Sequence, residues 1–129
     1  MSRKSKGINA ERELIHLFWK NNWSSIRVAG SGNMKYPCPD IIAGNSLRHL
    51  AIECKTINDT KKYFTEDDLH QLREFSRIFG SESWLAVKFA KQPWYFITPE
   101  DLEKTETNYV ITIDQAKTKG LLFEELLSH

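Results

Sequence analysis

The sequence contains no long apolar run and has few cysteines. No apolar segment approaches the roughly 20 residues that a membrane-spanning helix needs, and the basic N-terminus is not followed by the hydrophobic stretch of a secretory signal. Two cysteines, Cys38 and Cys54, are too few for a disulfide framework, and with four scattered histidines they lack zinc-finger spacing. We therefore expect reduced thiols, no zinc, a cytoplasmic location and no membrane contact.

The chain also lacks a marked excess of charge of one sign, because 18 Lys and Arg residues against 17 Asp and Glu residues give a net charge of +1. The distribution is nevertheless uneven. Residues 1–35 hold seven basic and two acidic side chains, whereas the remaining residues hold eleven and fifteen. This asymmetry favours a polyanion-binding site on one side of the molecule. A solubilising tail is the alternative, and it accounts for Arg3 to Lys6 but less well for Arg27 and Lys35.

The length of 129 residues and an apolar content of 40% fit one globular domain, so we expect a single domain over residues 1–129. Apolar periodicity and capping residues predict two helices, from about Ser5 or Gly7 to Asn22 and from the Thr65 cap to Phe79 before Gly80. They also predict five strands, at residues 24–29, 40–43, 50–55, 84–89 and 94–98. The predicted fold class is α/β, with a mixed sheet of about five strands flanked by helices.

Other segments have weaker patterns. Residues 56–64 are polar enough for a mobile loop, residues 109–113 fit an edge strand, and residues 121–127 fit a final helical segment. Five aromatic residues gather in the two later strands and could be mistaken for a base-stacking platform, but their strand setting favours a place in the core: Trp84, Phe89, Trp94, Tyr95 and Phe96.

The stretch from Pro39 to Lys55 has the pattern of a hairpin that carries charged side chains. Because side chains alternate along a strand, Glu53 and Lys55 share one face, and Asp40 enters from the start of the neighbouring strand. Carboxylates are the ligands that Mg²⁺ prefers, and a nearby lysine can place a water or offset charge on a phosphate. These residues match the degenerate PD-(D/E)xK nuclease motif. An exposed strand pair with ordinary cross-strand charges fits the same residues.

Glu11 is a further candidate, because a helical wheel places it near the middle of an apolar arc made by Ile8, Leu14, Ile15, Phe18 and Trp19. A carboxylate that faces the core is costly unless a cation compensates it. Alternatively, its place near the helix start suits the helix dipole and lets it reach water. The following strand alternates Ile26 and Val28 with Arg27, and the loop from Gly30 to Asn33 fits either a close approach to phosphate or a plain turn.

Six segments together resemble the archaeal Holliday junction resolvase family over roughly residues 4 to 98. They are G-I-N-A-E-R-E-L from Gly7, R-V-A-G-S-G from Arg27, P-D-I-I-A-G from Pro39, I-E-C-K from Ile52, E-F-S-R-I-F-G from Glu74 and L-A-V-K-F from Leu85. The resemblance implies a restriction-endonuclease-like core and a homodimeric, Mg²⁺-dependent endonuclease, with Mn²⁺ as a substitute. Such an enzyme nicks two opposed strands of a four-way DNA junction in recombination and repair.

The resemblance also implies roles for single residues. The catalytic set is Glu11, Ser31, Asp40, Glu53 and Lys55, of which Glu11, Asp40 and Glu53 would be metal ligands. The expected DNA contacts are Arg12, Arg27, Gly30 and Ser31, to which the charge pattern adds Lys4, Lys6, Lys61 and Lys62. Phe75 and Phe79 match positions of the family's dimer interface. The acidic segment Glu66–Asp68 departs from the basic character expected beside DNA.

Two other functions remain open at this point. One is a different PD-(D/E)xK endonuclease, of the restriction or repair type, and the other is a junction-binding protein without hydrolytic activity. The intact set of Glu11, Asp40, Glu53 and Lys55 favours an enzyme. A sliding clamp or a branch-migration helicase would be a further partner of the resolvase.

Overall fold

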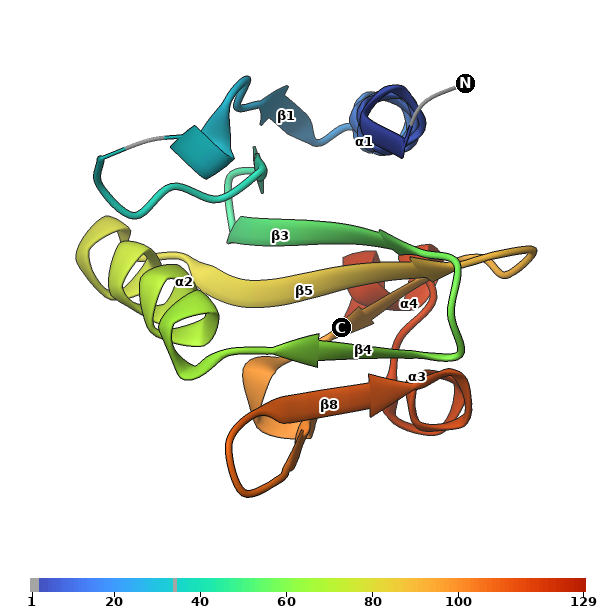
Figure 1. Cartoon of the computed structure of the whole chain (residues 1–129). Helices are drawn as coiled ribbons and strands as arrows, with labels where there is room; N and C mark the ends of the chain where they lie inside the picture. Colours follow the sequence, from blue (N-terminus) through green and yellow to red (C-terminus); the bar gives the residue numbers. More distant parts are fainter. Residues whose placement is uncertain (1–2, 34) are drawn as a thin grey trace.

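A mixed five-stranded sheet lies at the centre of the fold (Figure 1). The computed structural model describes residues 3–33 and 35–129. Its elements are, in order, α1 (Arg3–Lys20), β1 (Ser24–Arg27), η1 (Ser31–Asn33), β2 (Ile41–Gly44), β3 (His49–Ile57), β4 (Lys61–Phe64), α2 (Glu66–Phe79), β5 (Glu82–Phe89), β6 (Trp94–Ile97), η2 (Pro99–Asp101), β7 (Glu103–Lys104), β8 (Tyr109–Thr112), α3 (Ile113–Lys119) and α4 (Phe123–Ser128). The sheet has the order β1-β2-β3-β5-β6, in which only β3 and β5 are parallel.

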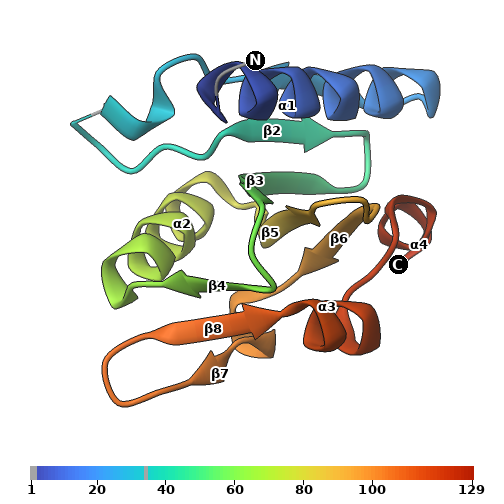
Figure 2. The ribbon, with the colours of Figure 1, turned by 45° about the vertical axis from the view of Figure 1, so that its right-hand side comes forward.

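The central sheet is covered on both faces. On one face, Leu50 and Ile52 of β3 belong to a buried cluster that includes side chains of α1 and α4. On the other face, Ala51 and Ile57 belong to a second cluster that includes side chains of α2, α3 and a smaller sheet of order β4-β8-β7 (Figure 2). Because both faces are buried, the central strands are almost continuously apolar. The predicted mixed sheet flanked by helices is confirmed.

The helix α2 begins and ends where the sequence predicts. The Thr65 hydroxyl accepts a hydrogen bond from the Asp68 amide at 3.1 Å, and the Asp68 carboxylate accepts one from the Thr65 amide at 2.9 Å. Gly80 ends the helix with a φ of 83°, a left-handed conformation that glycine adopts without strain. The helix therefore forms the crossover that brings β5 parallel to β3.

Two predicted segments differ from the structure. Residues 56–64 are not a loop throughout, because β3 continues to Ile57 and β4 pairs with β8 through Lys61↔Thr112 and Phe64↔Tyr109. In addition, β8 is the central strand of the smaller sheet and not an edge strand. The strands β4 and β8 lie about 50 residues apart in the sequence, and such a pairing leaves no local pattern in either segment.

The burial of the aromatic residues separates core from surface. The five strand aromatics Trp84, Phe89, Trp94, Tyr95 and Phe96 are buried, which confirms that they form part of the core. Trp19, expected on the apolar face of α1, is 59% exposed, and its indole Nε1 donates to the Ser25 carbonyl at 3.1 Å. Both cysteines are free, as expected. Within the described residues, every helix is too short or too polar to cross a bilayer.

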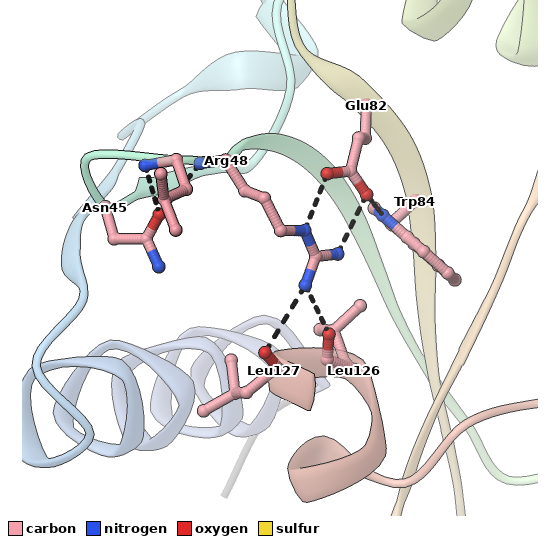
Figure 3. A network of polar contacts seen from close by, with 7 residues as sticks. Asn45, Arg48, Glu82, Trp84, Leu126 and Leu127 are labelled. Carbon is pink, nitrogen blue, oxygen red and sulfur yellow. Dashed lines mark hydrogen bonds and ion pairs between the residues drawn. The ribbon is translucent and has the colours of Figure 1, made fainter. Parts of the chain in front are cut away.

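Arg48 fixes the C-terminal helix to the sheet (Figure 3). Its Nε and Nη2 donate to the two carboxylate oxygens of Glu82 at 2.8 and 2.9 Å. Its Nη1 donates to the Leu126 carbonyl at 2.7 Å, near the C-terminal end of α4. The Trp84 indole also donates to Glu82, at 2.9 Å. One guanidinium thus joins the Glu82 carboxylate of β5 to a carbonyl at the end of α4.

We expect Arg48→Met to lower the free energy of unfolding by about 1–2 kcal/mol, because Glu82 and the end of α4 lose their shared donor. Urea unfolding followed by tryptophan fluorescence measures the change. Arg77→Met is the matched control, since Arg77 pairs with Glu74 on an exposed helix surface and its removal should leave stability almost unchanged. Equal effects of the two substitutions would contradict the role given to Arg48.

Candidate active site

The site forms where β2 separates from β3. The pairing of these strands ends at Ile41↔Ile52, while β3 continues to Ile57 with β5 alone as its neighbour in the sheet. At the fork the Asp40 amide donates to the Ile52 carbonyl at 3.0 Å. One step further the Asp40 carboxylate accepts the Cys54 amide at 2.8 Å and thus takes the place of a strand carbonyl. The backbone of β3 therefore holds Asp40 beside Glu53.

Glu53 and Lys55 lie next to each other on one face of β3, as the alternation predicts. The Lys55 ammonium is 3.6 Å from a Glu53 carboxylate oxygen, and both side chains are about one third exposed or less. The pKa of Glu53 is raised from 4.5 to about 8, first by burial and then by the negative charge of Asp40, whereas Lys55 lowers it. The structure therefore brings two carboxylates and one ammonium together.

Glu11 approaches the same group from α1. It follows the buried Ala10 and is itself only partly exposed. The pKa of Glu11 is raised to about 7, first by burial and then by the charge of Asp40, while Arg27 and Lys55 lower it. These interactions place a third carboxylate and an arginine near the fork. The helical wheel placed Glu11 near the middle of the apolar face, whereas the buried residues of α1 are Ala10, Leu14 and Phe18 and Glu11 lies partly buried at the edge of that face. Its catalytic role stays a prediction.

The orientation of β1 brings Arg27 toward Glu11, because the face of this strand that is turned toward α1 carries Ser25 and not Ile26. Ile26 is 59% exposed, whereas its polar neighbour Ser25 is buried against α1. Ser25 tolerates burial because its hydroxyl donates to the Ile15 carbonyl at 3.3 Å. Residues two apart share a face, so Arg27 lies on the same side as Ser25.

Ser31 connects the glycine-containing loop to the site. It begins the short 3₁₀ helix η1, and its hydroxyl donates to the second carboxylate oxygen of Asp40. The preceding Gly30 has a φ of 70°, a conformation that a side chain would strain. Both oxygens of Asp40 thus have a donor, one from β3 and one from Ser31, and this fixes the orientation of the carboxylate.

The remaining predicted DNA contacts come from α1 and β4. Arg12 is exposed on α1, and Lys6 is exposed near its beginning, where its ammonium donates to the Asn58 side chain at 3.4 Å. Lys61 and Lys62 lie on β4. Lys4 belongs to α1, but its side chain lies outside the described residues. Lys6, Lys61 and Lys62 therefore lie around the turn between β3 and β4.

The acidic segment at the start of α2 has local functions. Asp68 completes the helix cap, Asp67 accepts a hydrogen bond from Gln71 at 2.8 Å, and Glu66 accepts one from the Tyr109 hydroxyl at 2.6 Å. Their charges also suit the positive end of the helix dipole. Asp68 and Gln71 line a 40 Å³ cavity together with Glu53 and Cys38. No local pattern in the sequence indicates that Asp68 and Gln71 lie beside Glu53, because helix and strand meet there only in the folded chain.

The carboxylates of the fork suit a divalent cation. The pKa of Glu53 is raised first by burial and then by the charge of Asp40, so a cation beside the two carboxylates would favour their ionised forms. No three His, Cys, Asp or Glu side chains in residues 3–33 and 35–129 form a ready metal cluster. Mg²⁺ commonly binds through one or two carboxylates and keeps several waters. Asp40 and Glu53 fit this mode, and the three-ligand set with Glu11 stays a prediction.

Comparisons with known proteins agree over nearly the whole chain. A family model described as archaeal Holliday junction resolvase (Hjc) matches residues 2–129. The crossover junction endodeoxyribonuclease Hjc of Archaeoglobus fulgidus is 40% identical over 129 residues, which cover 95% of both chains. The protein of the same name from Methanocaldococcus jannaschii is 38% identical over 122 residues, which cover 95% of this chain and 86% of that one.

A solved structure is also similar. The 1.6 Å structure of Archaeoglobus fulgidus Hjc, a Holliday junction resolvase from an archaeal hyperthermophile, matches with a TM-score of 0.85 and 39% identity. The match covers 93% of this chain and 98% of that chain. The restriction-endonuclease-like α/β fold is therefore shown.

We expect the stability of the metal-free protein to depend on pH through Glu53 and Glu11. Both have a pKa in the folded state above 4.5, so folded protein binds more protons than unfolded protein between pH 4.5 and about 8. Their ionisation therefore destabilises the fold as the pH rises through this range. Glu53→Gln should exceed the wild type in stability at pH 8 by on the order of 1–2 kcal/mol.

Thermal unfolding from pH 5 to 8.5, with EDTA or with Mg²⁺, measures this dependence. Mg²⁺ should raise the melting temperature of the wild type most at pH 8, where the carboxylates are ionised, and should have little effect on Glu53→Gln. Glu106→Gln, a change of an exposed glutamate, should behave as the wild type does. A Glu53→Gln protein with an unchanged pH profile would contradict the interpretation of the site.

Proposed function

The chain belongs to the archaeal Holliday junction resolvase family, and we propose that it is a single-domain endodeoxyribonuclease that resolves four-way DNA junctions. The observation that carries this proposal is the convergence of Asp40, Glu53 and Lys55 at the fork of β2 and β3. Two carboxylates and a lysine are the groups that metal-assisted cleavage of a phosphodiester needs.

We propose Mg²⁺ as the metal, held by Asp40 and Glu53. The chemistry that it supplies in such a pair is stabilisation of negative charge on the phosphate and on the leaving oxygen. The protein contributes orientation, because Ser31 and the Cys54 amide hold the two oxygens of Asp40. Lys55, beside Glu53, is suited to donate a hydrogen bond to the attacking water and to offset charge on the phosphate.

Positive side chains around the fork support binding of DNA through its phosphates, so that the shape of the DNA and not its sequence is recognised. Arg27 lies near Glu11, and Arg12 is exposed on the same helix. Lys6, Lys61 and Lys62 surround the turn after β3. Contacts of arginine and lysine with phosphates fix the position of DNA but do not identify bases. We therefore propose that junctions are selected by their geometry.

A second copy of the chain would supply the second nick. Phe75 and Phe79 lie on α2 with their ring centroids 5.2 Å apart, and Phe79 is 53% exposed. The exposed Ile26 and Phe79 also line one open groove of about 670 Å³. An exposed apolar surface of this kind favours contact with another protein. We propose a two-fold symmetric dimer through it, which would present one site to each of two opposed strands.

The catalytic assignment predicts that Asp40→Asn and Glu53→Gln lower the rate of junction cleavage by on the order of 10²- to 10³-fold, because each removes charge that the metal requires. Cleavage of a labelled four-way junction in Mg²⁺, with a linear duplex of the same sequence as a second substrate, measures the effect. Binding of the uncut junction should remain, since the proposed phosphate contacts lie on other residues. Asp114→Asn, an exposed change on α3, is the control. Unchanged cleavage by either site variant would refute the metal assignment.

The dimer assignment predicts that Phe79→Glu gives a monomer that nicks junctions singly instead of in pairs, because a charge would be buried in the apolar interface. Sedimentation velocity gives the oligomeric state, and a supercoiled plasmid with a cruciform distinguishes nicked from linear products. Leu122→Glu alters a partly exposed apolar residue at the start of α4 and should leave the dimer intact. A dimeric Phe79→Glu protein would rule out this interface.

A further inference from the structure

A second groove opens at the end of β3, beside the candidate site. Its volume is about 680 Å³. Lys6 of α1, Thr56 of β3, Asn58 of the following turn, and Lys61, Lys62 and Tyr63 of β4 line it. Figure 2 shows the chain bending from β3 into β4 at this place. The groove is thus built from α1, which is distant in sequence, and from β3 and β4, which a turn connects.

The groove continues from the residues of the fork. Thr56 follows Lys55 in β3 but lies on the opposite face of the strand, the face that is turned toward α1. Lys6 precedes Glu11 by five residues in α1, which is about 7 Å along the helix axis. The helix and the strand lie close here, because a Cβ on Gly7 would be 3.7 Å from the Thr56 hydroxyl. The groove therefore lies beside the part of α1 that contributes Glu11 to the candidate site.

The charge of the groove is mainly positive. Its lining includes three lysines and only one acidic residue, Asp59. Within the described part of the chain, none of these lysines forms an ion pair with a carboxylate: Lys6 donates to Asn58, and the Lys61 ammonium lies 5.4 Å from the centroid of the Tyr63 ring. The lysines are therefore free to exchange these neutral partners for phosphates.

Tyr63 differs from its neighbours on β4. The next residue, Phe64, is 1% exposed and belongs to the core, whereas the Tyr63 side chain is on the other face of the strand and 46% exposed. The Lys61 ammonium lies 5.4 Å from the centroid of this ring and also interacts with the Tyr63 hydroxyl. The face of an exposed ring is the surface on which a nucleobase stacks. An exposed aromatic ring in a lysine-lined groove is the arrangement by which proteins hold single-stranded nucleic acid.

We propose, on the basis of the nuclease function proposed above, that Tyr63 stacks on an unpaired nucleobase of the strand that leaves the site, while Lys6, Lys61 and Lys62 hold its phosphates. A base within a duplex is already stacked on its neighbours and cannot meet the ring without being displaced. A base at the branch point of a junction is more readily exposed. Tyr63 is thus a specificity-determining residue that favours branched over linear DNA.

The test uses junctions that carry the fluorescent base 2-aminopurine, one position at a time, on either side of the cut. Binding is followed without divalent cation, so that the DNA stays intact. The wild type should quench the fluorescence at one or two positions, and Tyr63→Phe should do the same because it keeps the ring. Tyr63→Leu should lose the quenching and bind the junction about tenfold more weakly, with little change for linear duplex.

A second measurement does not depend on a variant. Irradiation of the wild-type complex with 5-iodouracil at the quenched position should join that base to Tyr63, and mass spectrometry of the digested protein identifies the residue. A crosslink to another residue, or quenching that Tyr63→Leu retains, would overturn the inference. The phosphate contacts are tested by the salt dependence of binding. The affinity for the junction falls as the salt concentration rises, and Lys61→Ala should make the slope of log affinity against log salt concentration shallower by about one, whereas Lys117→Ala on α3 should not change it.

Failure of this inference is distinguishable from failure of the proposed function. Wild-type protein that does not cut junctions in Mg²⁺ would contradict the proposed function itself. Wild-type protein that cuts junctions, with a Tyr63→Leu variant that quenches and binds as the wild type does, would contradict only the stacking role. Equal weakening of junction and duplex binding by Tyr63→Leu would also contradict it, because a general phosphate contact would then suffice.

Discussion

The hydrogen bond from the Cys54 amide to Asp40 is the interaction on which the site depends. A strand that loses its neighbour within a sheet exposes amides that need acceptors. Here the pairing of β2 with β3 begins only at Ile41, and the carboxylate of the preceding residue, Asp40, accepts the next free amide of β3. The same bond therefore completes the backbone of β3 and holds a carboxylate next to Glu53. One hydrogen bond thus serves both the fold and the candidate site.

This arrangement concentrates negative charge, and the rest of the site compensates it only in part. Burial and the charge of Asp40 raise the pKa values of both Glu53 and Glu11, while Lys55 and Arg27 act in the opposite sense. The proposed cation would therefore stabilise the ionised carboxylates of this site. Other parts of the molecule stabilise the fold, namely the two buried clusters and contacts such as the Arg48 network. A marginal site on a well-packed sheet is a common arrangement in enzymes.

Local patterns predicted much of this fold. Thr65, Asp68 and Gly80 identify the ends of α2, because capping depends on residues close in sequence. Alternation along β3 correctly places Glu53 and Lys55 together. The smaller sheet was not predicted, since β4 is too short and too polar to be recognised without its distant partner β8. Nor did hydropathy predict that Ser25 would be buried and Ile26 exposed, because contacts with α1 decide that choice.

The sequence by itself determined the candidate residues of the site, their spacing and the family to which the chain is similar. Only the tertiary structure decided how Asp40 is oriented, that Arg27 approaches Glu11, and that Lys6 and Tyr63 border one groove. The reason is physical. Residue type and local periodicity are properties of a short segment, whereas the position of one segment against another depends on the packing of the whole chain.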